Sequence, residues 1–544
     1  MPRPAVARQP PLGRPTMRSH FLLSTRPWAV LLGDRGRHAV NEHRAARPAA
    51  AASPLSSSAA PSGDTPEVPE LVAWLLRSNG RVDGATLANL AGRDGASGWG
   101  LKASQDVEQG HRLIVLPAAC HLTYGAQDDQ RLLALIQKVP DELWGAKLAL
   151  QLLSQRLRGP DSPFASYIAH LPKGIPGIPM FFGKRALDLI DYPPVSQQVQ
   201  KRCRWLYSFS QQVLAQLPGS PEDPFDGVTV DINALGWAMA CVSSRAFRTR
   251  GPTHPAAMLP LIDMANHTFA PNAEVLPLEG GAVGLFAKSK ISAGEPLLLS
   301  YGKLSNDFLF MDYGFIMPDN PYDTVQLRFE VGLLQAGAFV ANVTDSNGAP
   351  LDLTPTPWRL ALLSELGLAG PAANTEINLG GVELIDRRLL AAARVMVARQ
   401  EGEVAGRGVE RFCAIDRPLS RENEAAALRI VAGVVAVALS NFRTTLDQDL
   451  ALLAGEVPAQ APGAAAGGAG EASAELQPLS GEDEILAVRF RVEKKRILSR
   501  TLQRVAELRA ALSDNVELRQ ATGVANARKG SKPAPATNKG FGKK

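Results

Sequence analysis

Apolar positions repeat with the period of an α-helix in some parts of this chain and with the two-residue period of a β-strand in others. Residues 69–79 place Leu71, Trp74 and Leu75 on one stripe, which predicts a helix. A helical period returns over residues 128–218. The pattern alone therefore predicts a first short helix and, later, a block of helices.

Strand-like alternation flanks this helical block on both sides. Before it, residues 98–117 contain two alternating runs joined by a turn at 108–110, which predicts a β-hairpin. After it, short runs bounded by Gly, Pro or Asn predict strands near Met258, at 283–287 and at 297–301. A small β core split by a helical insertion at about 128–218 is therefore expected.

Beyond Asp323 the pattern becomes mainly helical, after one more strand expected at 325–331. Helices are expected at 357–366, 385–398, 421–442 and 484–512. Residues 455–478 are rich in Gly, Ala, Pro and Ser and are expected to form a disordered loop, because they cannot bury enough apolar surface to offset ordering. The fold class is therefore α+β, with a split β core at 69–324 and an all-helical domain at 325–515.

The two ends of the chain differ in composition from the middle. Residues 1–60 contain nine arginines, no lysine, only Asp34 and Glu42 as acids, and an Ala/Ser-rich run. This composition is typical of an organelle transit peptide, and a disordered leader is the alternative. Residues 516–544 form a basic, Lys/Gly/Pro-rich tail that is expected to be disordered. Because much of the basic excess lies at the ends, the pI of about 9.0 does not indicate a nucleic-acid partner.

The remaining composition is that of a globular protein of two or three domains, with 45% hydrophobic and 20% charged residues. No apolar run reaches the roughly 18 residues that a membrane span needs, so no membrane partner is expected. The cysteines are scattered, with no C-x-x-C pair and no His at metal-ligand spacing: Cys120, Cys203, Cys241 and Cys413. Neither a disulfide framework nor a metal site is predicted.

Common nucleotide and hydrolase motifs do not account for this chain. Residues 98–103 satisfy a loose G-x-G-x-x-A pattern, but a hairpin follows where a dinucleotide-binding fold requires a helix. The sequence contains no G-x-x-x-x-G-K-[ST] motif and no G-x-S-x-G motif. NTPase and serine-hydrolase functions are therefore not indicated.

Five short motifs occur in an order that points elsewhere. They are Gly98-Trp99-Gly100-Leu101, Ser244-Arg245-Ala246-Phe247, Asp263-Met264-Ala265-Asn266-His267, Leu299-Ser300-Tyr301-Gly302 and Asp312-Tyr313-Gly314-Phe315. In this order the chain resembles the SET domain of the Rubisco large-subunit methyltransferase family. The resemblance covers about residues 69–512. It implies a SET core with a helical insertion, followed by a helical substrate-binding domain.

The resemblance also implies a binding site for S-adenosylmethionine (AdoMet). In that family, residues at the positions of Gly98, Trp99 and Gly100 let the backbone approach the cofactor. Arg245 matches the arginine near the cofactor carboxylate, and Asn266 and His267 match the pair that contacts its amino and adenine parts. Asp263 is expected to orient this loop. From the residues alone, a strand-end ion pair for Arg245 and a turn cap for Asp263 remain alternatives.

Tyr301 matches the family's essential tyrosine, so it is the expected catalytic residue; core packing is the alternative. Tyr313 and Phe315 are expected to form an aromatic channel for the target amine. Ala273 is aligned where plant members have a further channel tyrosine, which leaves the channel width and the number of methyl groups open.

By this resemblance, the chain is expected to be an AdoMet-dependent protein-lysine N-methyltransferase of the chloroplast stroma, with a mitochondrial or cytosolic location as the alternative. Its implied substrate is the Rubisco large subunit or fructose-bisphosphate aldolase, and we expect a monomer. Two alternatives remain. A SET-type histidine methyltransferase is expected to lack the tyrosine at position 313, and a non-catalytic binding module is expected to have lost Tyr301, Asn266 or Arg245.

Overall fold

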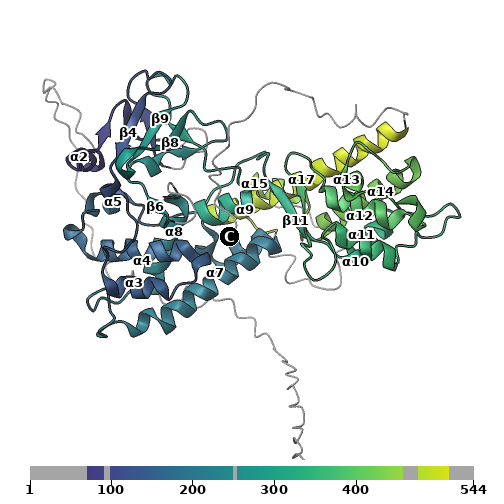
Figure 1. The fold of residues 1–544 in the computed structure, drawn as a ribbon, viewed down its shortest axis with the longest axis horizontal. Helices are drawn as coiled ribbons and strands as arrows, with labels where there is room; N and C mark the ends of the chain where they lie inside the picture. Colours follow the sequence, from purple (N-terminus) through teal and green to yellow (C-terminus); the bar gives the residue numbers. More distant parts are fainter. Residues whose placement is uncertain (1–69, 91–97, 249–253, 457–475, 514–544) are drawn as a thin grey trace, which may run out of the picture. The chain divides into compact units, whose positions relative to one another are not determined.

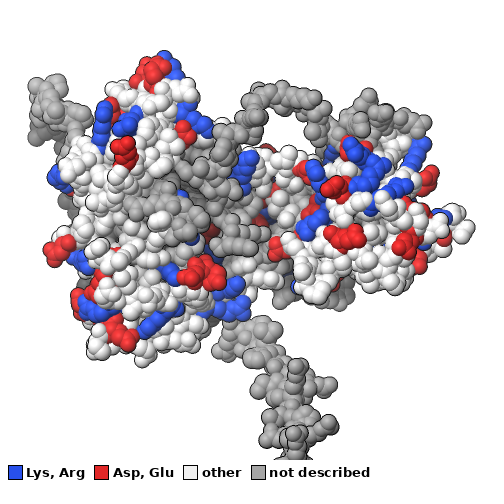
Figure 2. All heavy atoms as spheres, in the orientation of Figure 1, with Lys and Arg blue, Asp and Glu red and all other residues white. Residues whose placement is uncertain are grey.

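The computed structural model describes residues 70–90, 98–248, 254–456 and 476–513 (Figure 1). The expected transit peptide at 1–60, most of the expected loop at 455–478 and the expected tail at 516–544 lie outside these residues and stay predictions. Among the described residues, basic and acidic side chains are interspersed over the face drawn in Figure 2.

The N-terminal domain is built on a four-stranded antiparallel sheet with the order β1-β4-β9-β8. Its strands are β1 (Arg81–Val82), β4 (Arg112–Leu116), β9 (Val283–Ala287) and β8 (Ala273–Pro277). Leu113, Ile114 and Leu285 are fully buried in the core beneath it. The helix expected at 69–79 is confirmed as α2 (Glu70–Arg77), which packs against β1.

The prediction of a hairpin at 98–117 is wrong. β3 (Trp99–Ala103) pairs antiparallel with β2 (Ala85–Asn89), whereas β4 joins the four-stranded sheet. The other edge of β3 is also used, because Leu297 N–H donates to Leu101 O at 2.8 Å. The upstream partner was missed because β2 reads Ala-Thr-Leu-Ala-Asn, with only one β-branched residue and no aromatic residue to indicate a strand.

A helical insertion follows β4, as expected from the apolar period. Its helices are α3 (Gln130–Gln137), α4 (Trp144–Leu157), α5 (Ala165–His170), α6 (Lys184–Ile190) and α7 (Pro193–Gln212). The helical block continues beyond residue 218 into α8 (Ile232–Arg245), which packs on α4. Asp231 caps α8 by accepting a hydrogen bond from Ala234 N–H at 2.7 Å, so the helix runs from this cap to Arg245.

Short elements then lead back to the sheet and on to the C-terminal region. They are β5 (Ala246–Phe247), β6 (Ala257–Met258), β7 (Asn266–His267), β10 (Leu298–Leu299), α9 (Asn306–Phe308) and a π-helical turn, η8 (Leu309–Tyr313). β5 pairs with β6 antiparallel, and β7 pairs with β10 in parallel. The strands expected near Met258 and at 283–287 are confirmed as β6 and β9, whereas the strand expected at 297–301 is shorter, at Leu298–Leu299.

The C-terminal region is helical apart from one strand pair, β11 (Thr324–Arg328) with β12 (Glu376–Gly380). Its helices are α10 (Val331–Val340), α11 (Pro357–Glu365), α12 (Arg387–Val397), α13 (Val409–Cys413), α14 (Arg421–Ser440), α15 (Leu446–Leu453) and α17 (Glu482–Ser513). The four expected helices and the expected strand are confirmed. The strand ends at Arg328, because Val331 already begins α10.

α14 is long and apolar enough, by length and composition, to cross a membrane. In the structure more than half of its apolar window is buried, and it packs against α10, α12 and α17. A methyl group added at Gly433 of α14 would stand 1.9 Å from Gly337 O of α10, so the two helices touch at their backbones. These contacts account for the apolar composition of α14 as that of a core helix.

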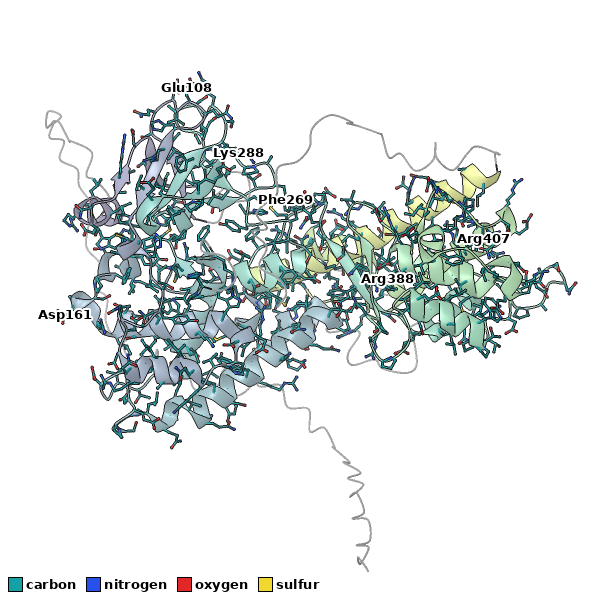
Figure 3. All side chains as sticks on the ribbon, viewed as in Figure 1. Glu108, Asp161, Phe269, Lys288, Arg388 and Arg407 are labelled. Carbon is teal, nitrogen blue, oxygen red and sulfur yellow. The ribbon has the colours of Figure 1, made fainter. Side chains whose placement is uncertain are left out.

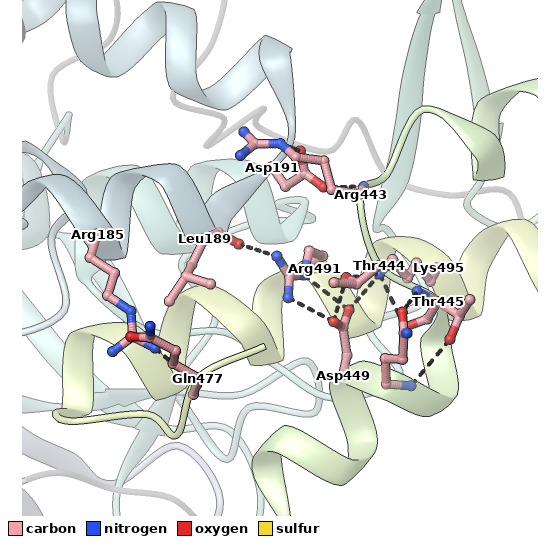
Figure 4. A network of polar contacts seen from close by, with 11 residues as sticks. Arg185, Leu189, Asp191, Arg443, Thr444, Thr445, Asp449, Gln477, Arg491 and Lys495 are labelled. Atoms are coloured by element: carbon pink, nitrogen blue, oxygen red, sulfur yellow. Dashed lines mark hydrogen bonds and ion pairs between the residues drawn. The ribbon is translucent and has the colours of Figure 1, made fainter. Parts of the chain in front are cut away.

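Buried charges join α17 to the rest of the molecule (Figure 4). Arg491 and Lys495 of α17 contact Asp449 at 2.7 and 2.6 Å, and all three side chains are at most 1% exposed. Arg491 also donates to Leu189 O in the insertion at 3.1 Å. The neighbouring residue of α17, Lys494, pairs with Asp323 at 2.7 Å. Because a buried charge is costly without its partner, these contacts fix α17 against both domains.

We expect Asp449→Asn to destabilise the fold by about 3–5 kcal/mol, because it leaves Arg491 and Lys495 buried without their countercharge. Urea unfolding followed by circular dichroism measures this loss. The control is Glu507→Gln, at a half-exposed carboxylate that pairs with Arg504 and should contribute less than about 1 kcal/mol. Equal stability of the two variants would contradict this account of α17.

Candidate active site

The two motifs that carry Asn266 and Tyr301 lie side by side. Parallel pairing of β7 with β10 places Leu298 opposite Asn266 and Leu299 opposite His267. Two residues after β10, Tyr301 donates from its backbone N–H to His267 Nδ1 at 3.1 Å and from its hydroxyl to Ala265 O at 2.8 Å. The Asn-His loop and the tyrosine segment therefore form one structural unit.

Aromatic rings extend from Tyr301. Its ring stacks on His267 with centroids 5.0 Å apart and on Tyr313 with centroids 4.9 Å apart, while Phe315 lies edge-on to Tyr313 at 6.1 Å. Burial raises the pKa of the Tyr301 hydroxyl to about 12 and also raises the pKa of Tyr313. Both phenols are therefore protonated at neutral pH, and the Tyr301 hydroxyl is a hydrogen-bond donor.

The position of Tyr313 is set by a π-helical turn, an element that is frequent at functional sites. The turn ends at Gly314, whose φ of 76° is left-handed and suits glycine. Inside the turn, the Asp312 carboxylate pairs with Arg202 of α7 at 2.5 Å. The backbone carbonyl of Asp312 accepts a hydrogen bond from the Ser243 hydroxyl of α8 at 3.2 Å. The helical insertion thus holds the segment that carries Tyr313.

His267 has a structural contact on its ring. Its Nδ1 accepts the Tyr301 N–H, so the neutral imidazole carries its proton on Nε2. Burial lowers the pKa of His267 to about 4. The ring therefore supports the Tyr301 backbone and is neutral when the protein is at pH 7.

Arg245, Asp263 and Tyr167 form a polar group next to these rings. Arg245 Nη1 donates to Asp263 O at 3.3 Å and lies 3.8 Å from the Asp263 carboxylate, which also accepts the Tyr167 hydroxyl at 2.5 Å. The Asp263 side chain is fully buried, and this burial raises its pKa to about 6. Within the described part of the chain, Asp263 Oδ1 and Arg245 Nε are buried without a hydrogen-bond partner. Asp263 Oδ1 can therefore accept a further hydrogen bond, and Arg245 Nε can donate one.

These residues line one cavity of about 950 Å³. Its wall includes the expected site residues Gly98, Trp99, Arg245, Asp263, Asn266, Tyr301, Tyr313 and Phe315. Gly100 lies behind this wall, where a methyl group would stand 2.8 Å from the Asn266 amide nitrogen, so the site requires glycine there. His267 supports the wall through Tyr301. The motifs that are far apart in the sequence thus meet at one cavity.

The expected position of Ala273 in the channel is wrong. Ala273 is 1% exposed, pairs with Ala287 inside the sheet and does not line the cavity. The loop after β7 instead brings Phe269, labelled in Figure 3, edge-on against His267 at 4.8 Å and Tyr322 at 5.1 Å. An aromatic residue two positions after the Asn-His pair was the signal that could have identified this packing.

The rest of the cavity wall was not predicted from the sequence. His170 comes from α5, Gly177 from the stretch between α5 and α6, and Leu486 and Arg489 from α17. Tyr167 of α5 lies behind this wall, where its hydroxyl donates to Asp263. Gly177 abuts the turn after Tyr313, because a methyl group there would stand 2.1 Å from Gly314 O. Among the described residues, no three His, Cys, Asp or Glu side chains converge as metal ligands.

A split β core with an Asn-His strand beside a buried tyrosine, followed by a helical domain, defines the class of protein. Comparison with family models agrees, since a SET domain matches residues 98–302 and a domain described as Rubisco LSMT substrate-binding matches residues 354–498. The chain is therefore a SET-domain protein with a Rubisco-LSMT-type substrate-binding domain. The family resemblance and the fold class expected from the sequence are confirmed.

Solved structures with this fold include the SET domain of LSMT bound to lysine and AdoHcy, with a TM-score of 0.57 at 18% identity. That match covers 85% of this chain and 97% of the other. Rubisco LSMT bound to AdoMet gives a TM-score of 0.55 at 18% identity, over 86% of this chain and 98% of the other. At this identity the likeness establishes the fold.

Sequence relatives include methyltransferases with two kinds of target. An actin-histidine N-methyltransferase of Danio rerio is 25% identical over 400 residues, which cover 71% of this chain and 62% of the relative. The ribosomal lysine N-methyltransferase set10 of Schizosaccharomyces pombe is 30% identical over 189 residues, which cover 33% of each chain. This chain therefore spans less than two thirds of the length of the Danio rerio relative.

We expect the imidazole of His267 to stay neutral down to about pH 4, because burial disfavours its charged form. Two-dimensional NMR of ¹⁵N-histidine-labelled protein, with the signal assigned through His267→Gln, follows the ring nitrogens across pH. The neutral Nε2–H tautomer is the expected species at pH 7. A charged ring at pH 7 would contradict the hydrogen bond from Tyr301 N–H.

Proposed function

We propose that this protein is an AdoMet-dependent methyltransferase that acts on a lysine of another protein. The observation that carries the proposal is the position of the Tyr301 hydroxyl, which donates a hydrogen bond to Ala265 O. The Tyr301 ring stacks on Tyr313, and both residues line the cavity. This arrangement supports the proposal, because a protonated phenol and a backbone carbonyl lie together beside the cavity, as transfer of a methyl group from a bound cofactor to an incoming amine requires.

The residues around the cavity fit AdoMet. Its amino-acid end carries a carboxylate, which suits the Arg245 guanidinium, and an ammonium, which suits the unpartnered oxygen of Asp263. The Asn266 side chain lies on the same wall, and Gly100 leaves the space that this side chain occupies. When bound, AdoMet supplies an electrophilic methyl group on a sulfonium sulfur.

The aromatic residues of the chain prepare the amine. A lysine ammonium with an ordinary pKa near 10.4 loses its proton at a cost of roughly 4–5 kcal/mol at pH 7. The rings of Tyr301, Tyr313 and Phe315 exclude water from its path, which disfavours the charged form and lowers this cost. They also align the amine for attack, so positioning and desolvation are the main contributions of the protein.

Histidine is the second candidate target, and the relatives named actin-histidine N-methyltransferase favour it. Lysine is favoured by Tyr313, which we expect histidine-directed members to lack, and by the lysine-directed relative. A non-catalytic binding module is disfavoured, because Tyr301, Asn266 and Arg245 all remain on the cavity wall.

The substrate and location are part of the proposal. The Rubisco-LSMT-type domain and the arginine-rich composition of residues 1–60 support a stromal target such as the Rubisco large subunit or aldolase. The interspersed charges in Figure 2 agree with a protein partner rather than a nucleic acid.

Tyr301→Phe should lower methyl transfer by about 10²-fold or more, because it removes one preorganised donor next to the reacting group. Cofactor affinity should change little, since the ring stacking remains. Transfer from labelled AdoMet and calorimetry of AdoMet binding measure the two effects. The matched control, Tyr207→Phe, removes a hydroxyl from an exposed tyrosine of α7 and should leave both unchanged. Full activity of Tyr301→Phe would remove Tyr301 from the catalytic role.

Incubation with labelled AdoMet and either stromal extract or actin, followed by mass spectrometry, identifies the target residue. A lysine target should give a rate that rises with pH well above 7, because its amine must be deprotonated, whereas a histidine target should plateau near pH 7. Labelled histidine in actin with such a plateau would overturn the lysine proposal and support the second candidate. The absence of any labelled protein would count against the enzyme itself.

A further inference from the structure

Tyr167 is a fully buried tyrosine of the insertion whose hydroxyl points at the cavity's polar group. It lies on α5, 96 residues before Asp263 in the sequence, and donates to Asp263 Oδ2 at 2.5 Å. Among the described residues, Tyr167 alone provides a side-chain hydrogen bond to this carboxylate. The insertion therefore contributes directly to the group of residues that faces the cofactor cavity.

The other side chains that face Asp263 donate no hydrogen bond to its carboxylate. Helix α8 contributes two of these groups, Arg245 and the Cys241 thiol. Arg245 Nη1 lies 3.8 Å from the Asp263 carboxylate and makes no side-chain hydrogen bond to it. From the segment after β10 comes Tyr301. Burial raises the pKa of both Cys241 and Tyr301 to about 12, so both are neutral and Arg245 is the one cation of this described set.

We propose that Tyr167 is a positioning residue of the active site: its hydroxyl holds the Asp263 carboxylate in the ionised form and orientation that keep Arg245 turned toward the cavity. This inference rests on the proposed function, because the groove it organises is the one that fits the amino-acid end of AdoMet. A hydrogen bond donated to a carboxylate stabilises its charged form.

The consequence is a link between Asp263 ionisation and ligand binding. When Asp263 is ionised, its carboxylate faces Arg245, and its free Oδ1 is available to an ammonium. When it is protonated, Arg245 loses its countercharge and the ammonium loses its acceptor. Because burial raises the pKa of Asp263 to about 6, affinity should fall as the pH drops through this range.

The test is Tyr167→Phe, which keeps the packed ring and removes only the donor. We measure binding of S-adenosylhomocysteine by calorimetry between pH 5 and 9, a readout independent of turnover. Affinity falls at low pH, and we call this part of the profile its acid limb. In the variant the acid limb should move to higher pH by about one to two pH units, the shift expected for losing a hydrogen bond to an ionised carboxylate. Near pH 6 the variant should therefore bind about tenfold more weakly, and the two profiles should converge at high pH.

Two further variants separate positioning from folding. Tyr192→Phe removes the hydroxyl of another buried tyrosine, which accepts from Gln326 N–H at 2.7 Å, and should leave the acid limb in place. Asp263→Asn removes the titrating carboxylate, so its acid limb should vanish, and adding Tyr167→Phe to it should change the pH profile no further. A shift that persists without the carboxylate would overturn the inference.

The ligand-free protein gives a second readout. Since the pKa of Asp263 is raised in the folded state, its contribution to the free energy of unfolding is full below about pH 4 and is lost as the pH rises through about 6. In Tyr167→Phe this loss should extend to higher pH, so the difference from the unmutated protein should grow between about pH 6 and 8. A stability difference that does not change with pH would assign Tyr167 a packing role only.

The two hypotheses fail in different ways. If the unmutated protein binds no S-adenosylhomocysteine at any pH, the proposed function fails and this inference fails with it. If the unmutated protein binds and Tyr167→Phe shows the same acid limb, the proposed function stands and the positioning role of Tyr167 is wrong.

Discussion

The parallel pairing of β7 with β10 is the constraint on which the site depends. It brings Asn266 and His267 beside the segment that ends in Tyr301, although the two segments are separated by a complete β-hairpin, β8 and β9. The hydrogen bonds from Tyr301 to His267 Nδ1 and Ala265 O then fix both ends of the tyrosine. With the residue held at its backbone and at its hydroxyl, the position of the phenol next to the cavity costs no reorganisation when a ligand binds.

The rest of the chain closes the cavity around this unit. The insertion supplies Gly177 to the wall and Tyr167 behind Asp263, and α17 supplies an outer wall that includes Leu486. The buried cations of α17 hold it in place, because each is paired with a carboxylate and Arg491 also bonds to the insertion. Residues outside the β core therefore contribute to both the shape and the charge of the site.

Local signals in the sequence predicted the long helices and the residues of the Asn-His and tyrosine segments, because these depend on period and on contiguous motifs. The β2–β3 pairing was missed, since β2 lacks the residues that mark a strand. The placement of Ala273 failed because the loop after β7 turns Phe269 back toward His267, and loop paths leave little trace in composition. Tyr167 could not be assigned, since its partner Asp263 is distant in sequence and only the folded chain brings them together.

A crystal structure of the protein with S-adenosylhomocysteine tests the central claim most directly. The account predicts that the ligand occupies the described cavity with its carboxylate on Arg245, its amino group toward Asp263 and its sulfur facing the Tyr301 hydroxyl. A ligand bound elsewhere, or a sulfur that faces away from the rings of Tyr301 and Tyr313, would contradict it.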